Sequence, residues 1–235
     1  MFIKSFRVMF SALRLLLKSP RVLLMLVLAW AGLLTAVYLF ASTREATISQ
    51  LLLTLVVVIV APALFFVLQA LSVTYADSPI IRTRQIALDC LKLIVVSLPV
   101  IALTLLAVHA LNKLQSHLTL ATTLRYLLIA VVAPMLVIQL WIAVTNGGLR
   151  SLAKRLHRVL AQTFAPQSMF VYACGFAIFA VVPCVLLQVS ISSQRPWVEL
   201  SVLIVRMAVS AILILLGWVT TVGAISILNR QTADA

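Results

Sequence analysis

Residues 48–74 read ISQLLLTLVVVIVAPALFFVLQALSVT and contain no Asp, Glu, Lys or Arg. About 20 apolar residues in an α-helix cross the hydrocarbon core of a bilayer, so this stretch is long enough to span one. Its apolar residues are continuous and do not alternate with polar ones, as they would in a transmembrane β-strand. The stretch therefore predicts a transmembrane helix, because in lipid a helix satisfies every backbone amide within its own segment.

The rest of the chain has the same character. Of its 235 residues, 64% are hydrophobic and 10% are charged, with a mean hydropathy of +1.20. A soluble domain is about half apolar and about a quarter charged, so this composition excludes one. We predict an all-α polytopic membrane protein that forms a single transmembrane domain over residues 1–235. Six spans are expected near residues 22–41, 48–74, 93–111, 124–145, 169–191 and 200–228.

The basic residues predict the orientation of these spans. The chain holds 18 Lys and Arg against 5 Asp and Glu, and most of the basic residues fall in alternate connections on one side. The other side holds only Arg44, Lys113, Arg125 and Arg195. Because cytoplasmic loops carry an excess of Lys and Arg, we expect a bacterial cytoplasmic (inner) membrane protein with both termini in the cytoplasm. Nucleic acid is not expected as a partner, because no soluble domain displays the positive charge.

The basic connections have a helical pattern. Segments near residues 2–19, 82–92 and 150–164 place basic and apolar side chains on opposite faces, and Pro20, Pro99 and Pro166 lie before or near the start of the next span. Such helices lie flat at the headgroup level and attract anionic lipid. The residues predicted to contact lipid headgroups are Lys4, Arg7, Arg14, Lys18, Arg82, Arg150, Lys154, Arg155 and Arg158.

Two spans share a short motif. Residues 60–64 read VAPAL and residues 132–136 read VAPML, and a basic stretch and another span follow each copy. The order of features predicts three copies of one unit, in which an interfacial helix precedes a pair of spans. The third copy has Ser210 and Ala211 in place of the Ala-Pro pair. The alternative is that basic amphipathic connectors are simply common in polytopic proteins.

These features carry a family resemblance. The Ala61-Pro62 and Ala133-Pro134 pairs, with the basic connectors 82–92 and 150–158, resemble bacterial six-helix integral membrane proteins like the membrane domain of glycerophosphoryl diester phosphodiesterases. The chain has no Pro-Gly pair in its spans and no soluble phosphodiesterase domain. The resemblance therefore implies a membrane module, and no catalytic residue is carried over.

Few residues in the spans are candidates for chemistry. Arg206 is a possible intramembrane anion or headgroup site, with a snorkelling side chain as the alternative. His109 is a possible axial ligand of a cofactor, with an interfacial histidine as the alternative. Pro62, Pro134 and Pro183 mark either broken helices that form a transport site or plain kinks. No metal site and no cofactor are predicted.

Two further patterns concern packing. Small residues such as Gly217, Gly223 and Ala224 give the last span a face for close contact with its own bundle or with another subunit. Trp30, Trp141 and Trp218 lie in or near the spans, where the sequence does not separate lipid contact from cofactor stacking.

The function expected from these patterns is non-catalytic, since no nucleophile, acid or metal ligands converge at one depth. The first hypothesis is an accessory or scaffold subunit of a membrane assembly, with anionic lipids and other membrane subunits or a second copy of the chain as partners. The alternative is a transporter or permease component for a lipid or amphipathic solute, which predicts a cavity between the helix pairs. The near absence of acidic residues within the spans disfavours ion-coupled transport.

Overall fold

The computed structural model describes residues 2–43, 47–76, 83–113, 118–189 and 196–233, and these parts are helical with no strand among them. The elements are α1 (Phe2–Lys18), α2 (Pro20–Ser42), α3 (Ile48–Thr74), α4 (Thr83–Lys113), α5 (Leu118–Leu127), η2 (Leu128–Val132), α6 (Ala133–Thr163), α7 (Pro166–Phe176), η3 (Ala177–Val181), α8 (Val182–Gln188) and α9 (Pro196–Ala233). Both η elements are single π-helical turns inside longer helices.

Six helical segments are long and apolar enough to cross a membrane: Pro20–Ser42, Ile48–Thr74, Arg84–Lys113, Thr119–Thr163, Pro166–Gln188 and Trp197–Gln231. Each of them contains most or all of one predicted span, and the prediction for residues 48–74 matches α3 at both ends. The all-α class and the multi-pass membrane character are therefore confirmed. The internal threefold repeat stays a prediction.

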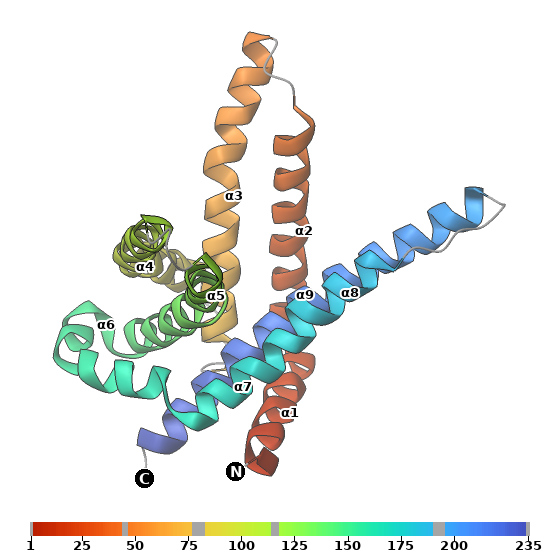
Figure 1. The fold of residues 1–235 in the computed structure, drawn as a ribbon. Helices are drawn as coiled ribbons and strands as arrows, with labels where there is room; N and C mark the ends of the chain where they lie inside the picture. The colour runs from red at the N-terminus through yellow and green to blue at the C-terminus, as the bar shows by residue number, and fades with distance from the viewer. Residues whose placement is uncertain (1, 44–46, 77–82, 114–117, 190–195, 234–235) are drawn as a thin grey trace.

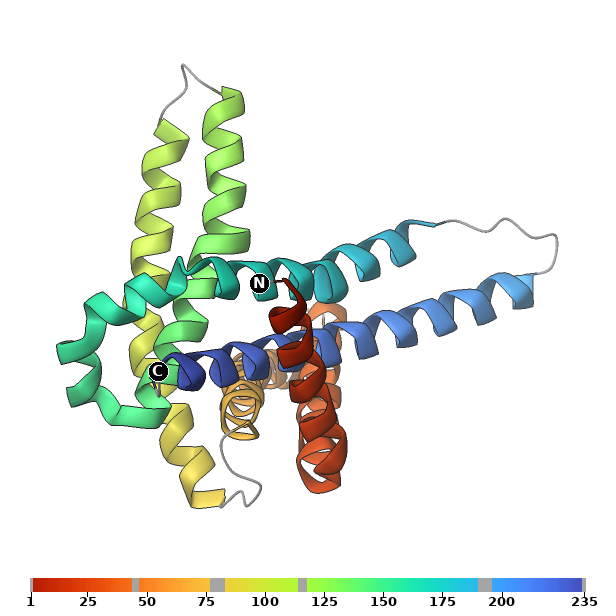
Figure 2. The same cartoon turned by 90° about the horizontal axis from the view of Figure 1, so that it is seen from below.

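The spanning segments pack as antiparallel hairpins that point in different directions. Helix α2 lies beside α3, α4 beside α5 and α6, and the α7–η3–α8 segment beside α9. The α2–α3 hairpin runs upward in Figure 1 and the α8–α9 hairpin runs to the right. The α4–α5 hairpin is viewed nearly end-on in Figure 1 and from the side in Figure 2, where it runs upward. All of them start from a common base, where both chain ends lie (Figure 1). The outer half of each hairpin therefore faces the surroundings of the protein.

The core is concentrated at this base. The last turns of α3 are buried, whereas most of its first half is exposed, and the same change occurs along α9. Glycines allow close approach here: a Cβ added at Gly217 would lie 2.9 Å from Cβ of Phe179, and one added at Gly223 would meet the ring of Tyr75. The hydroxyl of Tyr75 donates to the carbonyl of Val219 at 3.2 Å. The small face of the last span thus packs within its own bundle.

Helix α1 is anchored on the base by one face. Its buried residues Ser5, Val8, Ala12 and Leu16 recur every three to four positions, and α1 packs against α7 and α9. The predicted helix near residues 2–19 is therefore present. Its position at a lipid headgroup layer stays a prediction.

The second basic connector differs from its prediction. Residues 83–113 form one helix that continues through Pro99, so the expected boundary between an interfacial helix near 82–92 and a span near 93–111 does not occur. Residues 83–113 hold no glycine, so no residue there readily adopts the positive φ that would break the helix. The connector therefore continues into the span as one helix.

The third connector does have a boundary. Gly148 has φ 73° and ψ 171°, a backbone conformation open almost only to glycine, and it bends α6 into two helical halves. The half that follows Gly148 contains the basic segment predicted near residues 150–164 and folds back along the base (Figure 2). Gly148 therefore permits this connector to form a separate helical half.

The intramembrane prolines are accommodated in two ways. Pro62 and Pro99 lie inside α-helices, whereas Pro134 and Pro183 each follow a π-helical turn. In η2 the N–H of Ala133 donates to the carbonyl of Leu128. Proline lacks a backbone N–H, and the π-helical turns change which carbonyls the neighbouring N–H groups reach. Such local adjustments allow proline in membrane helices.

Candidate functional site

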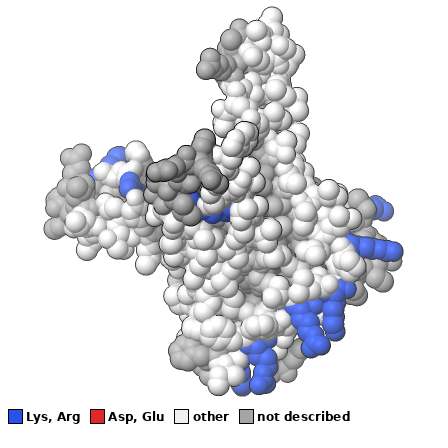
Figure 3. Space-filling view, turned by 90° about the vertical axis from the view of Figure 1, so that its right-hand side faces the viewer, with Lys and Arg blue, Asp and Glu red and all other residues white. Residues whose placement is uncertain are grey.

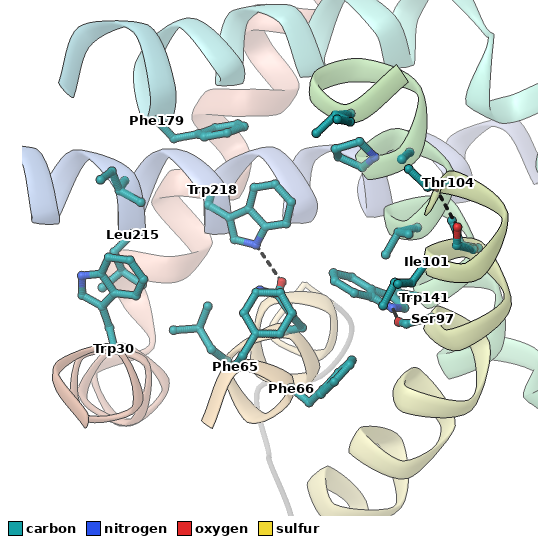
Figure 4. A pocket seen from close by; sticks show the side chains of 18 of the residues that line it. Trp30, Phe65, Phe66, Ser97, Ile101, Thr104, Trp141, Phe179, Leu215 and Trp218 are labelled. Carbon is teal, nitrogen blue, oxygen red and sulfur yellow. Dashed lines mark hydrogen bonds between the residues drawn. The ribbon is translucent and has the colours of Figure 1, made fainter. Parts of the chain in front are cut away.

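A cavity of about 460 Å³ lies where the hairpins meet (Figure 4). Helices from every hairpin contribute to its wall. The lining residues are Trp30 of α2, Phe65, Phe66, Leu68 and Gln69 of α3, Ser97, Val100, Ile101, Thr104 and Leu105 of α4, Ile129 of η2, Ala133, Pro134, Val137 and Trp141 of α6, Phe179 of η3, and Ile214, Leu215 and Trp218 of α9. The cavity therefore exists only in the assembled fold.

Three tryptophans, one from each hairpin, line this cavity. Trp30, Trp141 and Trp218 lie in α2, α6 and α9. The indole of Trp218 donates to Oε1 of Gln69 at 2.7 Å, and that of Trp141 donates to Oγ of Ser97 at 2.8 Å. These bonds orient two of the indoles and connect helices that are far apart in the sequence. The structure thus brings together residues whose roles the sequence left open.

Phenylalanine rings lie beside the indoles in the wall of the cavity. The ring centroid of Phe65 lies 6.4 Å from that of Trp141 and 5.5 Å from that of Phe66, and both pairs are T-shaped. Phe179 lies edge-on to Trp218 with 5.2 Å between the ring centroids. Figure 4 shows these rings around a common space. Such edge-to-face pairs hold aromatic walls in fixed positions.

One side of the cavity opens to the surface of the protein. Ile101 is 48% exposed, Leu105 is 64% exposed and Ile129 is 49% exposed, although all three line the cavity. They lie on α4 and η2, in the part of the chain that forms membrane spans. This side of the cavity is therefore bordered by exposed apolar side chains.

The lining favours apolar ligands. No residue lining the cavity in the described chain is Asp, Glu, Lys, Arg, His or Cys. Most of its few polar groups are bonded, since Gln69 and Ser97 accept from the indoles and Oγ1 of Thr104 donates to the carbonyl of Val100 at 2.7 Å. The buried indole nitrogen of Trp30 is the exception among the described lining residues, because it has no hydrogen-bond partner. A cavity of this size with so few polar groups is typical of a site for a small apolar or amphipathic molecule.

The intramembrane candidates from the sequence lie elsewhere. Arg206 donates through Nε to the carbonyl of Leu186 at 2.7 Å and through its terminal nitrogen to that of Leu187 at 3.1 Å. These carbonyls lie in the last turn of α8 and have no helical donor of their own, so Arg206 caps this helix. His109 is exposed near the end of α4. Neither residue lines the cavity.

The predicted headgroup residues lie on the surface. Lys4, Arg7, Arg14 and Lys18 are exposed on α1, and so are Lys154, Arg155 and Arg158 on α6. Figure 3 shows Lys and Arg gathered along the lower edge of one face, at the end of the molecule that α1 occupies in Figure 1. Arg150 is also exposed, and Arg82 lies outside the described residues. Within the described part of the chain, no group of His, Cys, Asp and Glu could hold a metal ion.

Comparison of the chain with protein families, curated proteins and solved structures found no match. The fold and its composition define the class: this is a multi-pass integral membrane protein with an apolar cavity between its helical hairpins.

Sequence analysis did not locate the cavity. The one usable signal is that three of the spans carry a tryptophan away from the basic flanks, where an interfacial anchor would lie. That these side chains converge depends on the angles between hairpins, which residue periodicity does not specify.

Proposed function

We propose that this protein binds the apolar part of a lipid or amphipathic solute in the cavity between its hairpins, as part of a transport or lipid-handling system of the membrane. The single observation that carries the proposal is the cavity of about 460 Å³ lined by Trp30, Trp141 and Trp218. A cavity between the helix pairs is what the transporter hypothesis predicts, whereas a purely structural subunit needs only packed helices.

The opening beside Ile101 and Leu105 supports entry from the membrane. The cavity is apolar, and its wall is fixed by indole hydrogen bonds from Trp141 and Trp218. A preformed wall reduces the ordering cost of binding. The proposed function is therefore recognition and passage of a molecule, without a chemical reaction.

The membrane setting proposed from the sequence fits this function. We place the protein in a bacterial cytoplasmic membrane with both termini in the cytoplasm, where α1 and the second half of α6 contact anionic headgroups. The positions of the two chain ends at one end of the molecule support a common side for both termini (Figure 1).

A second candidate is the accessory or scaffold subunit. It is favoured by the outer halves of the hairpins, where residues such as Leu51, Leu55 and Ile59 are exposed. Lipid covers such a surface, and so would another membrane protein or a second copy of the chain. Copurification of a stoichiometric partner in a mild detergent would support this candidate.

Fluorescence quenching tests the proposed cavity ligand. We would titrate the full chain, carrying Trp197→Phe and held in uncharged micelles, with a fatty acid that is brominated in the middle of its chain. Trp197 is 79% exposed, so its removal leaves the cavity tryptophans as the emitters. We expect quenching that saturates, because bound ligand contacts these indoles at a limited site.

Substitutions at Thr104 distinguish the cavity from lipid contact in general. Thr104→Phe places a ring in the cavity and should weaken saturable quenching by about tenfold or more, whereas Thr104→Val keeps the size of the side chain and should leave it nearly unchanged. Quenching that rises linearly with the fatty acid, and equally in both variants, would contradict the proposal.

A further inference from the structure

A second hollow, of about 200 Å³, lies at the base of the protein between the two halves of α6 and the end of α9. Its residues come from both sides of the bend at Gly148. They are Ile142, Ala143, Asn146, Gly147, Ser151, Leu152, Arg155, Arg158, Val159, Gln162, Asn229 and Arg230. Unlike the cavity between the hairpins, this hollow has charged and amide side chains in its wall.

Three guanidinium groups belong to its wall. Arg155 and Arg158 are three residues apart on α6 and therefore share a face, and Arg230 comes from the end of α9. No Asp or Glu is among the described residues that line the hollow. An anion that binds beside these guanidinium groups would accept charge-assisted hydrogen bonds from them. Guanidinium groups match the oxygens of a phosphate in particular.

A chain of amide side chains holds the two helices together beside the arginines. Nδ2 of Asn229 donates to Oε1 of Gln139 at 2.6 Å, and Nε2 of Gln139 donates to the carbonyl of Gln162 at 3.4 Å. Gln139 is buried. These bonds hold the end of α9 that carries Arg230 against the part of α6 that carries Arg158.

The bend at Gly148 creates the room. It directs the second half of α6 back toward α9, and Oγ of Ser151 donates to the carbonyl of Gly148 at 2.9 Å. A neighbouring hollow of about 420 Å³ shares Arg158, Gln162 and Asn229 with the first. The remainder of a phosphate-containing molecule has space there.

We infer that the hollow formed by Arg155, Arg158 and Arg230 is a binding site for a phosphate group. The phosphate belongs either to the headgroup of an anionic lipid or to a soluble phosphate compound. This inference rests on the headgroup contact proposed above for the second half of α6 and deepens it by adding Arg230 and a defined hollow. It does not depend on the proposed ligand of the apolar cavity, because none of these arginines lines that cavity.

Calorimetric titration of the full chain in uncharged micelles tests the site. One arm uses inorganic phosphate, and the other uses micelles doped with short-chain phosphatidylglycerol, with phosphatidylcholine as the net-neutral comparison. The variants are Arg155→Gln on α6 and Arg230→Gln on α9. The control is Arg84→Gln, which makes the same charge change at an exposed residue of α4 outside the hollow.

We expect at least one probe to bind the wild-type chain and each pocket variant to weaken that binding about tenfold or more. Arg84→Gln should change it no more than about fivefold, which is the effect of one basic residue near a charged surface. Binding of inorganic phosphate identifies a soluble phosphate compound, and binding of phosphatidylglycerol alone identifies a lipid headgroup. Failure of both probes to bind, or equal losses in Arg84→Gln and Arg155→Gln, would overturn the inference.

Discussion

The hydroxyl of Tyr172 donates a hydrogen bond of 2.6 Å to the backbone carbonyl of Ala130. In an α-helix this carbonyl would accept from the N–H four residues later, but that residue is Pro134, which has none. A tyrosine on α7 thus supplies the donor that a proline on α6 removes. The bond joins two spans at the point where η2 departs from regular α-helical geometry.

The first prediction concerns this bond. Tyr172→Phe should lower the free energy of unfolding by about 1–2 kcal/mol, because a partly buried carbonyl loses its donor while the ring remains in place. In a Pro134→Ala background the backbone N–H returns, so the same substitution should cost clearly less. Unfolding by titration with a denaturing detergent measures both. Equal losses in the two backgrounds would show that the hydroxyl of Tyr172 does not replace the N–H that Pro134 lacks.

The second prediction concerns contact between α9 and η3. A Cβ at Gly217 would lie 2.9 Å from Cβ of Phe179 and 3.1 Å from its backbone nitrogen, and neither atom moves without shifting the helix. Gly217→Ala should therefore destabilise the protein by about 1–3 kcal/mol. Thermal unfolding in micelles measures the loss.

Gly32→Ala is the matched control for this substitution. Its Cβ would meet only the flexible end of Leu64, 3.1 Å away. Alanine also has a higher helix propensity than glycine, by about 1 kcal/mol, so the free energy of unfolding of this variant should be unchanged or increased. If both alanines have the same effect, close helix contact at Gly217 is not the cause.

The third prediction concerns the bend in α6. No atom lies within 4 Å of a Cβ built at Gly148, so Gly148→Ala meets no clash, and its whole cost comes from the positive φ of 73°. We expect a loss of about 1–3 kcal/mol in thermal unfolding. Leu149→Ala is the control. It shortens an exposed side chain at the next position, where φ is negative, so it tests a change of side chain without the positive φ. A neutral Gly148→Ala would mean that the bend is not required.

The fourth prediction separates Arg206 from the cavity. Arg206→Leu removes both donors to the end of α8 and should lower stability by about 1–3 kcal/mol, while the saturable quenching by the brominated fatty acid is retained. Arg206→Lys should recover part of the stability through its remaining charge. Loss of quenching at unchanged stability would instead support the intramembrane binding site that the sequence suggests.

The connectors show where prediction from sequence succeeds. The run of residues 48–74 has no charge and no glycine, so its helix begins and ends where the apolar run does. The basic connectors look alike in the sequence, yet α4 continues through its connector and α6 bends at Gly148. Glycine permits the bend but does not require it, because tertiary contacts select the backbone conformation.

The candidate sites show where prediction fails. Arg206 is predicted as a candidate site because it is a charged residue inside a span, but in the structure its side chain caps the end of α8. The cavity is built from Trp30, Trp141 and Trp218, which have no common motif or spacing. Residues that are far apart in the chain meet through the directions of the hairpins, and local periodicity contains no information about these directions.

The sequence by itself determined that this is a multi-pass helical membrane protein, because the cost of burying backbone amides and charges in lipid acts on each segment alone. It also located six apolar stretches, each of which lies mostly or wholly within one helical segment long enough to cross a membrane. Only the tertiary structure decided that the hairpins diverge from a common base, leaving an apolar cavity between them and an arginine-lined hollow below. Those features depend on which surfaces pack together, through contacts such as Gly217 with Phe179 and Tyr172 with Ala130.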